Sequence, residues 1–310
     1  MAITVVGNVF VDIKGFPDDN YISGGRNAGH VEHVHGGVGR NVAEDIANVE
    51  LRPRFVSMVD DTAEGAEVLK KLNNHKVNTE YVLSVPDGMG LWLAVFDETG
   101  DIVGSISKRP DMTALAKLVE EKGDEIFADC DSIVLEIDLD KEIIKSVFKY
   151  AEKYNKRVYA VVANMSIATQ RRDFLQSIDC FVCNAEEAGI LFVCDMSGLS
   201  PEALCEELSK RVMSARIPSM VVTLGSRGAV YADMHGDKGV YPAQRVNVRD
   251  TTGAGDAFCA GVAMGLTYGK TMREAVEIGT RLAASVITVS ENVCPRFLPR
   301  ELGLDIDVTD

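Results

Sequence analysis

The stretch Asp250-Thr251-Thr252-Gly253-Ala254-Gly255-Asp256 is followed at once by an apolar run of small residues, 257–264. The glycines therefore lie where a loop is expected to turn into a buried helix. They leave no side chain to keep an anion away from successive backbone N–H groups. The first turn of a helix also has unpaired donors and the positive end of the helix dipole. We therefore predict that this loop binds a phosphate.

Asp256 is expected in the same helical turn, where the dipole would keep its carboxylate ionised. Such a carboxylate can accept a proton from a hydroxyl that approaches the phosphate. The chemistry indicated is phosphoryl transfer to an alcohol, with the amides of Gly253, Ala254, Gly255 and Asp256 stabilising the transferred group. On spacing alone, a glycine-rich loop capped by an aspartate is the alternative.

Length and charge limit the classes of partner. The 310 residues suffice for one large α/β domain with an appendage, or for two domains. A net charge of −15 repels nucleic-acid phosphate and anionic membranes, so we expect neither as a partner. No apolar stretch reaches the roughly 18 residues of a membrane span, and residues 1–7 lack the basic start of a signal peptide. We expect a cytoplasmic protein.

Two groups of potential metal ligands have simpler explanations. Cys180 and Cys183 have C-x-x-C spacing, but they lie in a predicted buried strand without a second pair, which favours core packing over a redox or metal role. His30, His33 and His35 have no carboxylate or cysteine at ligand spacing, so we expect them to contact substrate or solvent.

Short β-branched runs alternate with amphipathic stretches along most of the chain. This pattern predicts a three-layer α/β/α core whose mostly parallel sheet is covered by helices on both faces. The expected strands are 3–6, 55–59, 132–136, 158–162, 180–183 and 220–224. The expected helices are 38–49, 63–74, 141–154, 201–215, 255–268 and 272–289.

Segments 14–35 and 88–108 interrupt the pattern, because they resemble hairpins rich in turn residues. We expect them to form a small sheet beside the main one. Both alternating faces of 91–96 are apolar, which an edge sheet exposed to water could not sustain without a cover. One face could close over a ligand and the other could contact a second subunit; packing against the main domain is the alternative.

Candidate acceptor-binding residues lie near the N-terminus. Gly36-Gly37-Val38-Gly39-Arg40-Asn41-Val42-Ala43 joins a hairpin segment to a helix. Its paired glycines allow a ligand close to the backbone, and Asn41 adds a donor and an acceptor, which suits a polyol. Asp12 follows the first strand, where a carboxylate could bind vicinal hydroxyls. The alternatives are a structural turn for the glycines and a solvated aspartate.

Candidate nucleotide-binding residues follow two later strands. Asn184 and Glu187 are expected on one side of an opening helix, where Glu187 could hold Mg²⁺ through water. Thr223-Leu224-Gly225-Ser226-Arg227-Gly228 ends another strand with glycines and hydroxyls that could support a nucleotide. By contrast, Gly265–Thr271 only approximates a P-loop, and Thr271 with Glu274 predicts a capping box instead.

Taken together and in this order, these motifs resemble the ribokinase (PfkB) family of sugar and nucleoside kinases over essentially the whole chain. The resemblance implies a single kinase domain, 1–310, with a β-sheet lid built from about 13–36 and 88–112. In relatives the lid often also mediates dimerisation, so a homodimer through the lid is expected. ATP and Mg²⁺ are the implied cofactors.

The resemblance also implies roles for single residues. Asp256 would be the catalytic base and Gly253, Ala254 and Gly255 the anion hole. Asn184 and Glu187 would serve the phosphates and magnesium, with Thr223, Gly225 and Gly228 flanking the nucleotide. Asp12, Gly36, Gly37, Asn41 and Glu136 would hold the substrate hydroxyls. Members that bind a monovalent cation do so beside the anion hole, where Asp250 and Thr252 match, so the resemblance allows K⁺ there.

Within the family, the 36–43 stretch is most similar to pseudouridine kinases. The expected reaction is therefore transfer of the ATP γ-phosphate to a primary hydroxyl of a ribosyl-type substrate, first the 5′-hydroxyl of pseudouridine. The alternatives are a kinase for ribose, fructose or adenosine, and a regulator without turnover. Specificity is expected to depend on lid residues such as His33, His35, Ser105 and Ser107. The usual Asp-Pro is missing around Ala163-Asn164.

Overall fold

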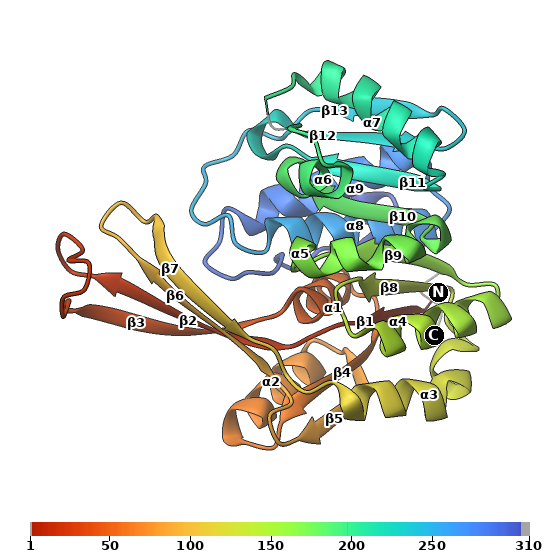
Figure 1. Cartoon of the computed structure of the whole chain (residues 1–310). Coiled ribbons are helices and arrows are strands. Elements are labelled where there is room, and N and C mark those ends of the chain that lie inside the picture. The colour runs from red at the N-terminus through yellow and green to blue at the C-terminus, as the bar shows by residue number, and fades with distance from the viewer. Residues whose placement is uncertain (1, 197, 305–310) are drawn as a thin grey trace.

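A nine-stranded sheet forms the centre of the computed structural model, which describes residues 2–196 and 198–304 (Figure 1). Its strands are β1 (Ile3–Val6), β4 (Arg54–Asp60), β5 (Asn78–Val85), β8 (Ser132–Glu136), β9 (Arg157–Val161), β10 (Cys180–Asn184), β11 (Ser219–Thr223), β12 (Ala229–Asp233) and β13 (Lys238–Tyr241). All neighbours pair in parallel except β12, which is antiparallel to β11 and β13. The mostly parallel sheet is therefore confirmed.

Helices cover both faces of this sheet, because its strands are apolar on both sides. Ile133 of β8 packs into one buried cluster and Val134 into the other. The first cluster is covered by α3 (Thr113–Phe127), α4 (Lys141–Lys153), α5 (Met165–Ala168), α6 (Ala185–Phe192) and α7 (Pro201–Ala215). The second is covered by α1 (Val38–Asn48), α2 (Ala63–Asn74), α8 (Ala254–Thr267) and α9 (Met272–Val286). The predicted three-layer α/β/α fold is confirmed.

The strand order, β13-β12-β11-β10-β9-β8-β1-β4-β5, reverses direction around β1. From β1 the chain builds outward through β4 and β5 on one side, and later through β8 to β11 on the other. In open α/β sheets, ligands bind outside the carboxyl ends of the strands at such a switch point. The ends of β1, β8, β10 and β11 therefore mark the edge where a site is expected.

A second sheet of four strands projects from the main body (Figure 1). Its order is β3 (Gly29–Gly36), β2 (Phe10–Pro17), β6 (Gly90–Phe96) and β7 (Ile102–Lys108). The predicted small sheet is present, although β2 and β6 pair in parallel rather than within one hairpin. We call it the small sheet.

The register of the small sheet decides which side chains share a face. Asp12 of β2 lies opposite Val34 of β3 and Trp92 of β6. Because side chains alternate along a strand, His33 and His35 point to the other face from Asp12. These two histidines therefore do not share the Asp12 face, and His33 is exposed, as the alternative of a solvent contact held. Ser105 and Ser107 of β7 lie on the same face as Asp12, and both are exposed.

Two predictions about local structure are confirmed. Cys180 and Cys183 are both buried and pack into the two different core clusters, so they lie on opposite faces of the sheet. Thr271 and Glu274 form a capping box at the start of α9, with Thr271 N donating to Glu274 Oε2 at 2.8 Å. Among the helices within 2–196 and 198–304, none has the length and apolar character that a membrane span requires.

Candidate active site

Helix α8 begins at the glycine-rich loop, as the sequence predicts. Gly253 is its N-cap residue, with a left-handed φ of 80°. A Cβ at Gly253 would lie 2.0 Å from the carbonyl oxygen of Asn292. Glycine is therefore required here for two reasons, the backbone conformation and the close approach of the segment after α9.

The first turn of α8 has free backbone donors. The N–H groups of Gly253, Gly255 and Asp256 have no hydrogen-bond acceptor within the described parts of the chain. Ala254 differs from them, because its N–H donates to the carbonyl oxygen of Thr251 at 3.3 Å. A Cβ at Gly255 would meet no atom within 4 Å. This end of the helix can therefore accept an anion, mainly through three of the four amides that we expected.

The Asp256 side chain faces helix α1, where Asn41 Nδ2 donates to its Oδ2 at 2.6 Å. Burial raises the pKa of Asp256 to about 6, although the hydrogen bond from Asn41 and the charge of Arg40 oppose the rise. The nearby carboxylates of Asp12 and Glu187 add to it. Burial therefore outweighs the two stabilising contacts, and at a pKa of about 6 the carboxylate is still mostly ionised at neutral pH, as expected. A carboxylate with this pKa suits a general base near neutral pH.

Asp250 and Thr252, the residues expected beside a monovalent cation, bond to each other. Asp250 Oδ1 accepts from Thr252 N at 2.9 Å and from Thr252 Oγ1 at 2.8 Å. Burial acts to raise the pKa of Asp250, but these two hydrogen bonds and the charge of Lys14 hold it below the ordinary value. Asp250 is therefore ionised, and one of its oxygens is already used within the loop.

The Gly36–Gly39 turn joins the small sheet to α1 and brings Asp12 to the site. A Cβ at Gly36 would lie 2.4 Å from Asp12 Oδ2, so the absence of a side chain makes room for that carboxylate. Gly37 is the N-cap of α1 with a φ of 97°. The turn is therefore structural, as one alternative held, and it also positions the candidate acceptor residues Asp12 and Asn41.

Helix α1 contains a buried polar network that the sequence analysis did not predict. The Arg40 and Glu44 side chains are 1% and 0% exposed, and Arg40 Nη1 donates to Glu44 Oε2 at 2.5 Å. Arg40 also donates to the carbonyl oxygens of His35 and Gly36 and to Asn292 Oδ1. Lys71 Nζ lies 3.3 Å from Glu44 Oε1. Arg40 thus joins the small sheet, α1 and the segment that contacts Gly253.

Glu136 lies beneath the site and does not face open space. It is 1% exposed, and its carboxylate accepts from Asn8 N, Asn8 Nδ2 and Gly39 N at 2.9, 2.9 and 3.2 Å. Burial, with a smaller effect from the nearby Asp138, raises the pKa of Glu136 to about 8. Its contacts fix the end of β1 against the start of α1.

Asn184 and Glu187 lie together at the start of α6 and form a capping box. Asn184 Oδ1 accepts from Glu187 N at 2.8 Å, and Glu187 Oε2 accepts from Asn184 N at 2.7 Å. Burial raises the pKa of Glu187, and the charge of Asp138 adds to the rise. The motif therefore stabilises the helix, and it also contributes one of several carboxylates that surround the start of α8.

The Thr223–Gly228 loop lies beside Asn184, because Thr223 is opposite Asn184 in the β10–β11 pairing. Gly225 is exposed and has a left-handed φ of 58°. A Cβ at Gly228 would lie 2.0 Å from the carbonyl oxygen of Tyr241, so this glycine allows β13 to approach. Thr223 and Gly225 therefore border the same edge as Asn184, whereas Gly228 supports the loop from behind.

Asp138 contacts the Ala163-Asn164 segment, where the expected Asp-Pro is missing. Its Oδ1 accepts from Ala163 N at 3.0 Å, and it is buried at the end of β8. Burial raises the pKa of Asp138. No local sequence pattern marks Asp138, because its contact is with the segment that follows strand β9.

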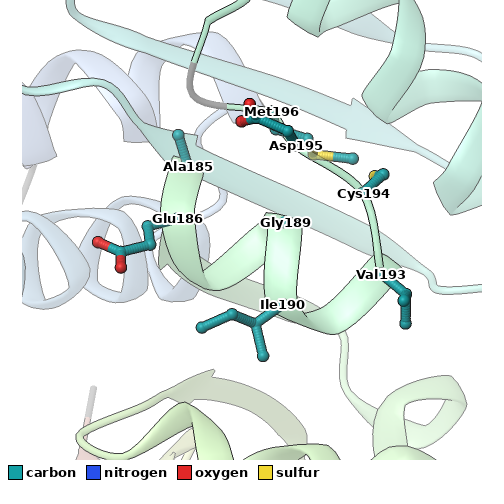
Figure 2. A pocket seen from close by; sticks show the side chains of 8 residues that line it. All are labelled: Ala185, Glu186, Gly189, Ile190, Val193, Cys194, Asp195 and Met196. Atoms are coloured by element: carbon teal, nitrogen blue, oxygen red, sulfur yellow. The ribbon is translucent and has the colours of Figure 1, made fainter.

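A separate cavity of about 350 Å³ lies against α6 and the segment that follows it (Figure 2). It is lined by Ala185, Glu186, Gly189, Ile190, Val193, Cys194, Asp195 and Met196. None of the candidate site residues lines this cavity, so the candidate active site lies elsewhere, between the small sheet and the start of α8.

Known kinases resemble this chain in sequence. The family model described as pfkB family carbohydrate kinase matches residues 2–293. A guanosine-inosine kinase from Exiguobacterium acetylicum is 35% identical over 295 residues, which cover 94% of this chain and 95% of the relative. A pseudouridine kinase from Escherichia coli strain K12 is 24% identical over 275 residues, covering 88% and 86%.

Solved structures share the fold. A ribokinase from Arabidopsis thaliana, complexed with ribose and ATP, superposes with a TM-score of 0.80 at 21% identity and covers 99% of this chain and 100% of its own. An adenosine kinase from Sinorhizobium meliloti has a TM-score of 0.75 at 20% identity, covering 94% and 95%. The order of the layers and the presence of a smaller sheet are therefore those of ribokinase-like proteins.

Proposed function

Because the chain belongs to the pfkB family of carbohydrate kinases, phosphotransferases that act on an alcohol group of a sugar or nucleoside, we propose that it phosphorylates the 5′-hydroxyl of a nucleoside with ATP as donor. One observation carries the proposal. The Asp256 carboxylate stands beside amides of Gly253, Gly255 and Asp256 that have no acceptor among the described residues.

In the proposed reaction, Asp256 accepts the proton of the 5′-hydroxyl as its oxygen attacks the γ-phosphorus. The bond from that phosphorus to the bridging oxygen breaks, and ADP leaves with the electron pair. The free amides of the first turn of α8 stabilise the charge on the transferred group. Asn41 orients the Asp256 carboxylate through the 2.6 Å hydrogen bond. Asp12 and Asn41 would bind the ribose hydroxyls, with Glu136 holding the turn that positions Asn41.

Guanosine and inosine are the first acceptors that we propose. The support is the 35% identity, over nearly the whole of both chains, to a protein named for these two nucleosides. Pseudouridine is the second candidate, supported by the Gly36–Ala43 stretch and by the 24% identical relative named for it.

Burial raises the pKa of Glu187, and the charges of Asp138 and Glu186 add to the rise, so a nearby cation would favour its ionised form. We propose that Glu187 holds Mg²⁺ through water. When bound, Mg²⁺ would offset the negative charge of the donor phosphates. We also propose K⁺ beside Asp250, which rate measurements in K⁺ and in Na⁺ buffers would test.

We propose that the small sheet closes over the acceptor with its Asp12 face and contacts a second copy with its other face. The second part is supported by Val31 and Ile106, which are 63% and 70% exposed and alternate away from Asp12. Sedimentation of the wild-type protein and of Ile106→Asp tests it. A dimer that Ile106→Asp dissociates is expected, and a monomeric wild type would contradict it.

An acceptor panel tests the function directly. ADP release is measured with ATP, Mg²⁺ and guanosine, inosine, pseudouridine, adenosine, ribose or fructose, and the product is identified by mass spectrometry. We expect the highest kcat/KM with a nucleoside and a nucleoside 5′-monophosphate as product. Asp256→Asn is expected to fold normally and lose at least about a hundredfold in turnover. The highest kcat/KM with a free sugar, or near-normal turnover of Asp256→Asn, would contradict the proposal.

A further inference from the structure

Lys14 is a buried cation for which the protein supplies no partner. It is 8% exposed, and in residues 2–196 and 198–304 its ammonium makes no hydrogen bond and no ion pair within 4.0 Å. Burying an ammonium without a partner is costly, so a group outside the chain is expected to complete its contacts. Glu32, which lies opposite Lys14 in the β2–β3 pairing, is exposed and lies 3.9 Å from His30 Nε2 instead.

The register places Lys14 in the candidate acceptor site. It is two residues after Asp12 on β2, so both side chains project from the same face of the small sheet. Trp92 of β6 lies opposite Asp12 on that face, and its indole N–H also has no acceptor within the described ranges. The small, fully buried Ala94 lies opposite Lys14.

Charge effects agree with this placement. The Lys14 ammonium opposes the rise that burial causes in the pKa of Asp12. It also lowers the pKa of Asp250. Burial raises that pKa, and the hydrogen bonds from Thr252 lower it together with Lys14. Lys14 is therefore close to Asp12 on the small sheet and to the loop that leads into α8. An acceptor whose ribose is held by Asp12 would extend its base along this face, toward Lys14 and Trp92.

We propose that Lys14 and Trp92 form the nucleobase site, in which Trp92 stacks on the base and Lys14 donates to the O6 and N7 acceptors of a 6-oxopurine. The proposal rests on the proposed nucleoside kinase function. An ammonium has three donors and no acceptor. Guanine and hypoxanthine present two acceptors on that edge, whereas adenine presents an amino donor at position 6. Lys14 thus selects guanosine and inosine over adenosine.

Three variants test the selection by Lys14. Values of kcat/KM are measured with guanosine, inosine and adenosine for wild type, Lys14→Met and Lys14→Gln. We expect Lys14→Met to lose about tenfold to a hundredfold with guanosine and inosine, mainly through KM, and to keep its value with adenosine. Lys14→Gln is expected to raise kcat/KM with adenosine relative to kcat/KM with guanosine, because an amide can accept from N6 and donate to N7.

The matched control is Lys108→Met, on strand β7 of the same sheet, where the lysine is half-exposed and pairs with Asp87 at 2.8 Å. It is expected to leave all three kcat/KM values unchanged. Equal losses with guanosine, inosine and adenosine in Lys14→Met would overturn the proposal, since Lys14 would then act on the phosphoryl group. The proposal would also be overturned if Lys14→Met kept the wild-type ratio of kcat/KM with guanosine to kcat/KM with adenosine. A wild type that prefers adenosine would overturn it as well.

Trp92 provides a measurement that needs no catalysis, because it is the only tryptophan of the chain. Stacking predicts that inosine changes its fluorescence in a saturable manner without ATP, and that Lys14→Met binds inosine more weakly. No fluorescence change at inosine concentrations that saturate the rate would overturn the stacking. A wild type inactive with every nucleoside refutes the proposed function itself, whereas activity with an unchanged ratio in Lys14→Met refutes only this inference.

Discussion

The two sides of the candidate site differ in how their polar groups are partnered. On the main-body side, Asp256 bonds to Asn41, Asp250 to Thr252, and Asn184 to Glu187. On the small-sheet side, the side chains of Asp12, Lys14 and Trp92 make no hydrogen bond with the described residues, although Lys14 is buried.

This difference separates two tasks. Groups held by the protein itself are already oriented before a ligand arrives, which is what phosphoryl transfer requires of a base and an anion-binding turn. Groups without partners gain their contacts only when an acceptor binds. Substitutions on the main-body side should therefore reduce stability or turnover, whereas those on the small-sheet side should reduce acceptor binding and leave stability unchanged.

The largest effect on stability is expected from Arg40→Met. Arg40 is 1% exposed and joins β3, Glu44 and Asn292, and its loss leaves Glu44 with only Lys71 and His75 nearby. Removing one member of a buried ion pair costs about 3–5 kcal/mol. We expect the free energy of unfolding in urea to fall by about 3 kcal/mol.

The double variant Arg40→Met/Glu44→Gln sharpens this prediction, because it removes the charge that the single variant leaves behind. It is expected to recover at least about 1 kcal/mol of the loss. If the single variant were as stable as wild type, Arg40 would not hold the two segments together, and the main-body side would not be preorganised by this network.

Two alanine substitutions in one turn should separate stability from activity. Gly253→Ala introduces a Cβ at a φ of 80° and 2.0 Å from Asn292 O, so we expect a loss of more than about 1 kcal/mol in unfolding free energy. Gly255→Ala meets no atom within 4 Å. It should fold at least as well as wild type, because alanine favours a helix more than glycine does.

Turnover of Gly255→Ala is nevertheless expected to fall by about a hundredfold, since the added methyl group keeps a phosphoryl group from the free amides. Thermal unfolding and ADP release on the same samples provide the comparison. Normal turnover of Gly255→Ala would mean that the anion does not bind at this turn.

The main-body side was largely predictable from the sequence because its signals are local. The Gly253–Asp256 turn, the 36–43 stretch and the Asn184–Glu187 pair each depend on residues a few positions apart, which is the range over which caps and helix starts are determined. The six predicted strands and the six predicted helices were found for the same reason. The polar network of Arg40 was missed, since its burial depends on Asn292, which is distant from Arg40 in sequence.

The small-sheet side could not be predicted in the same way. Alternation shows that Asp12 and Lys14 share a face, but not which histidines of β3 share it, because that depends on the Asp12–Val34 register. The sequence analysis therefore named His33 and His35 without placing them on a face, whereas the pairing puts Val34 beside Asp12. Strands β5 and β13 were missed because they lie at the sheet edges, where half-exposed residues give weaker apolar runs. Strand β12 was missed although four of its five residues are buried.

Asp12→Asn tests the small-sheet side. Asp12 makes no hydrogen bond within the described chain, and burial raises its pKa, so removal of its charge should not destabilise the fold. We expect an unchanged melting temperature and a KM for the nucleoside that rises about tenfold, the scale of a lost charged hydrogen bond. Glu32→Gln on β3 is the control and should change neither value. A marked loss of stability in Asp12→Asn would show that this side is also held by internal contacts.

The smallest effect, and the most direct test of preorganisation, concerns pH. Asp256 works as a base in its deprotonated form, and its pKa is about 6. The value of kcat/KM should therefore be constant above this pH and fall as the pH decreases through it.

Asn41 donates to the ionised carboxylate, so Asn41→Ala should raise the pKa of Asp256 and move the midpoint of this fall to higher pH. Asn48→Ala on the same helix, where the amide donates to Cys294 O, should leave the midpoint in place. The midpoint is independent of any loss of acceptor affinity in Asn41→Ala, so an unshifted midpoint would mean that this bond does not set the charge of the base.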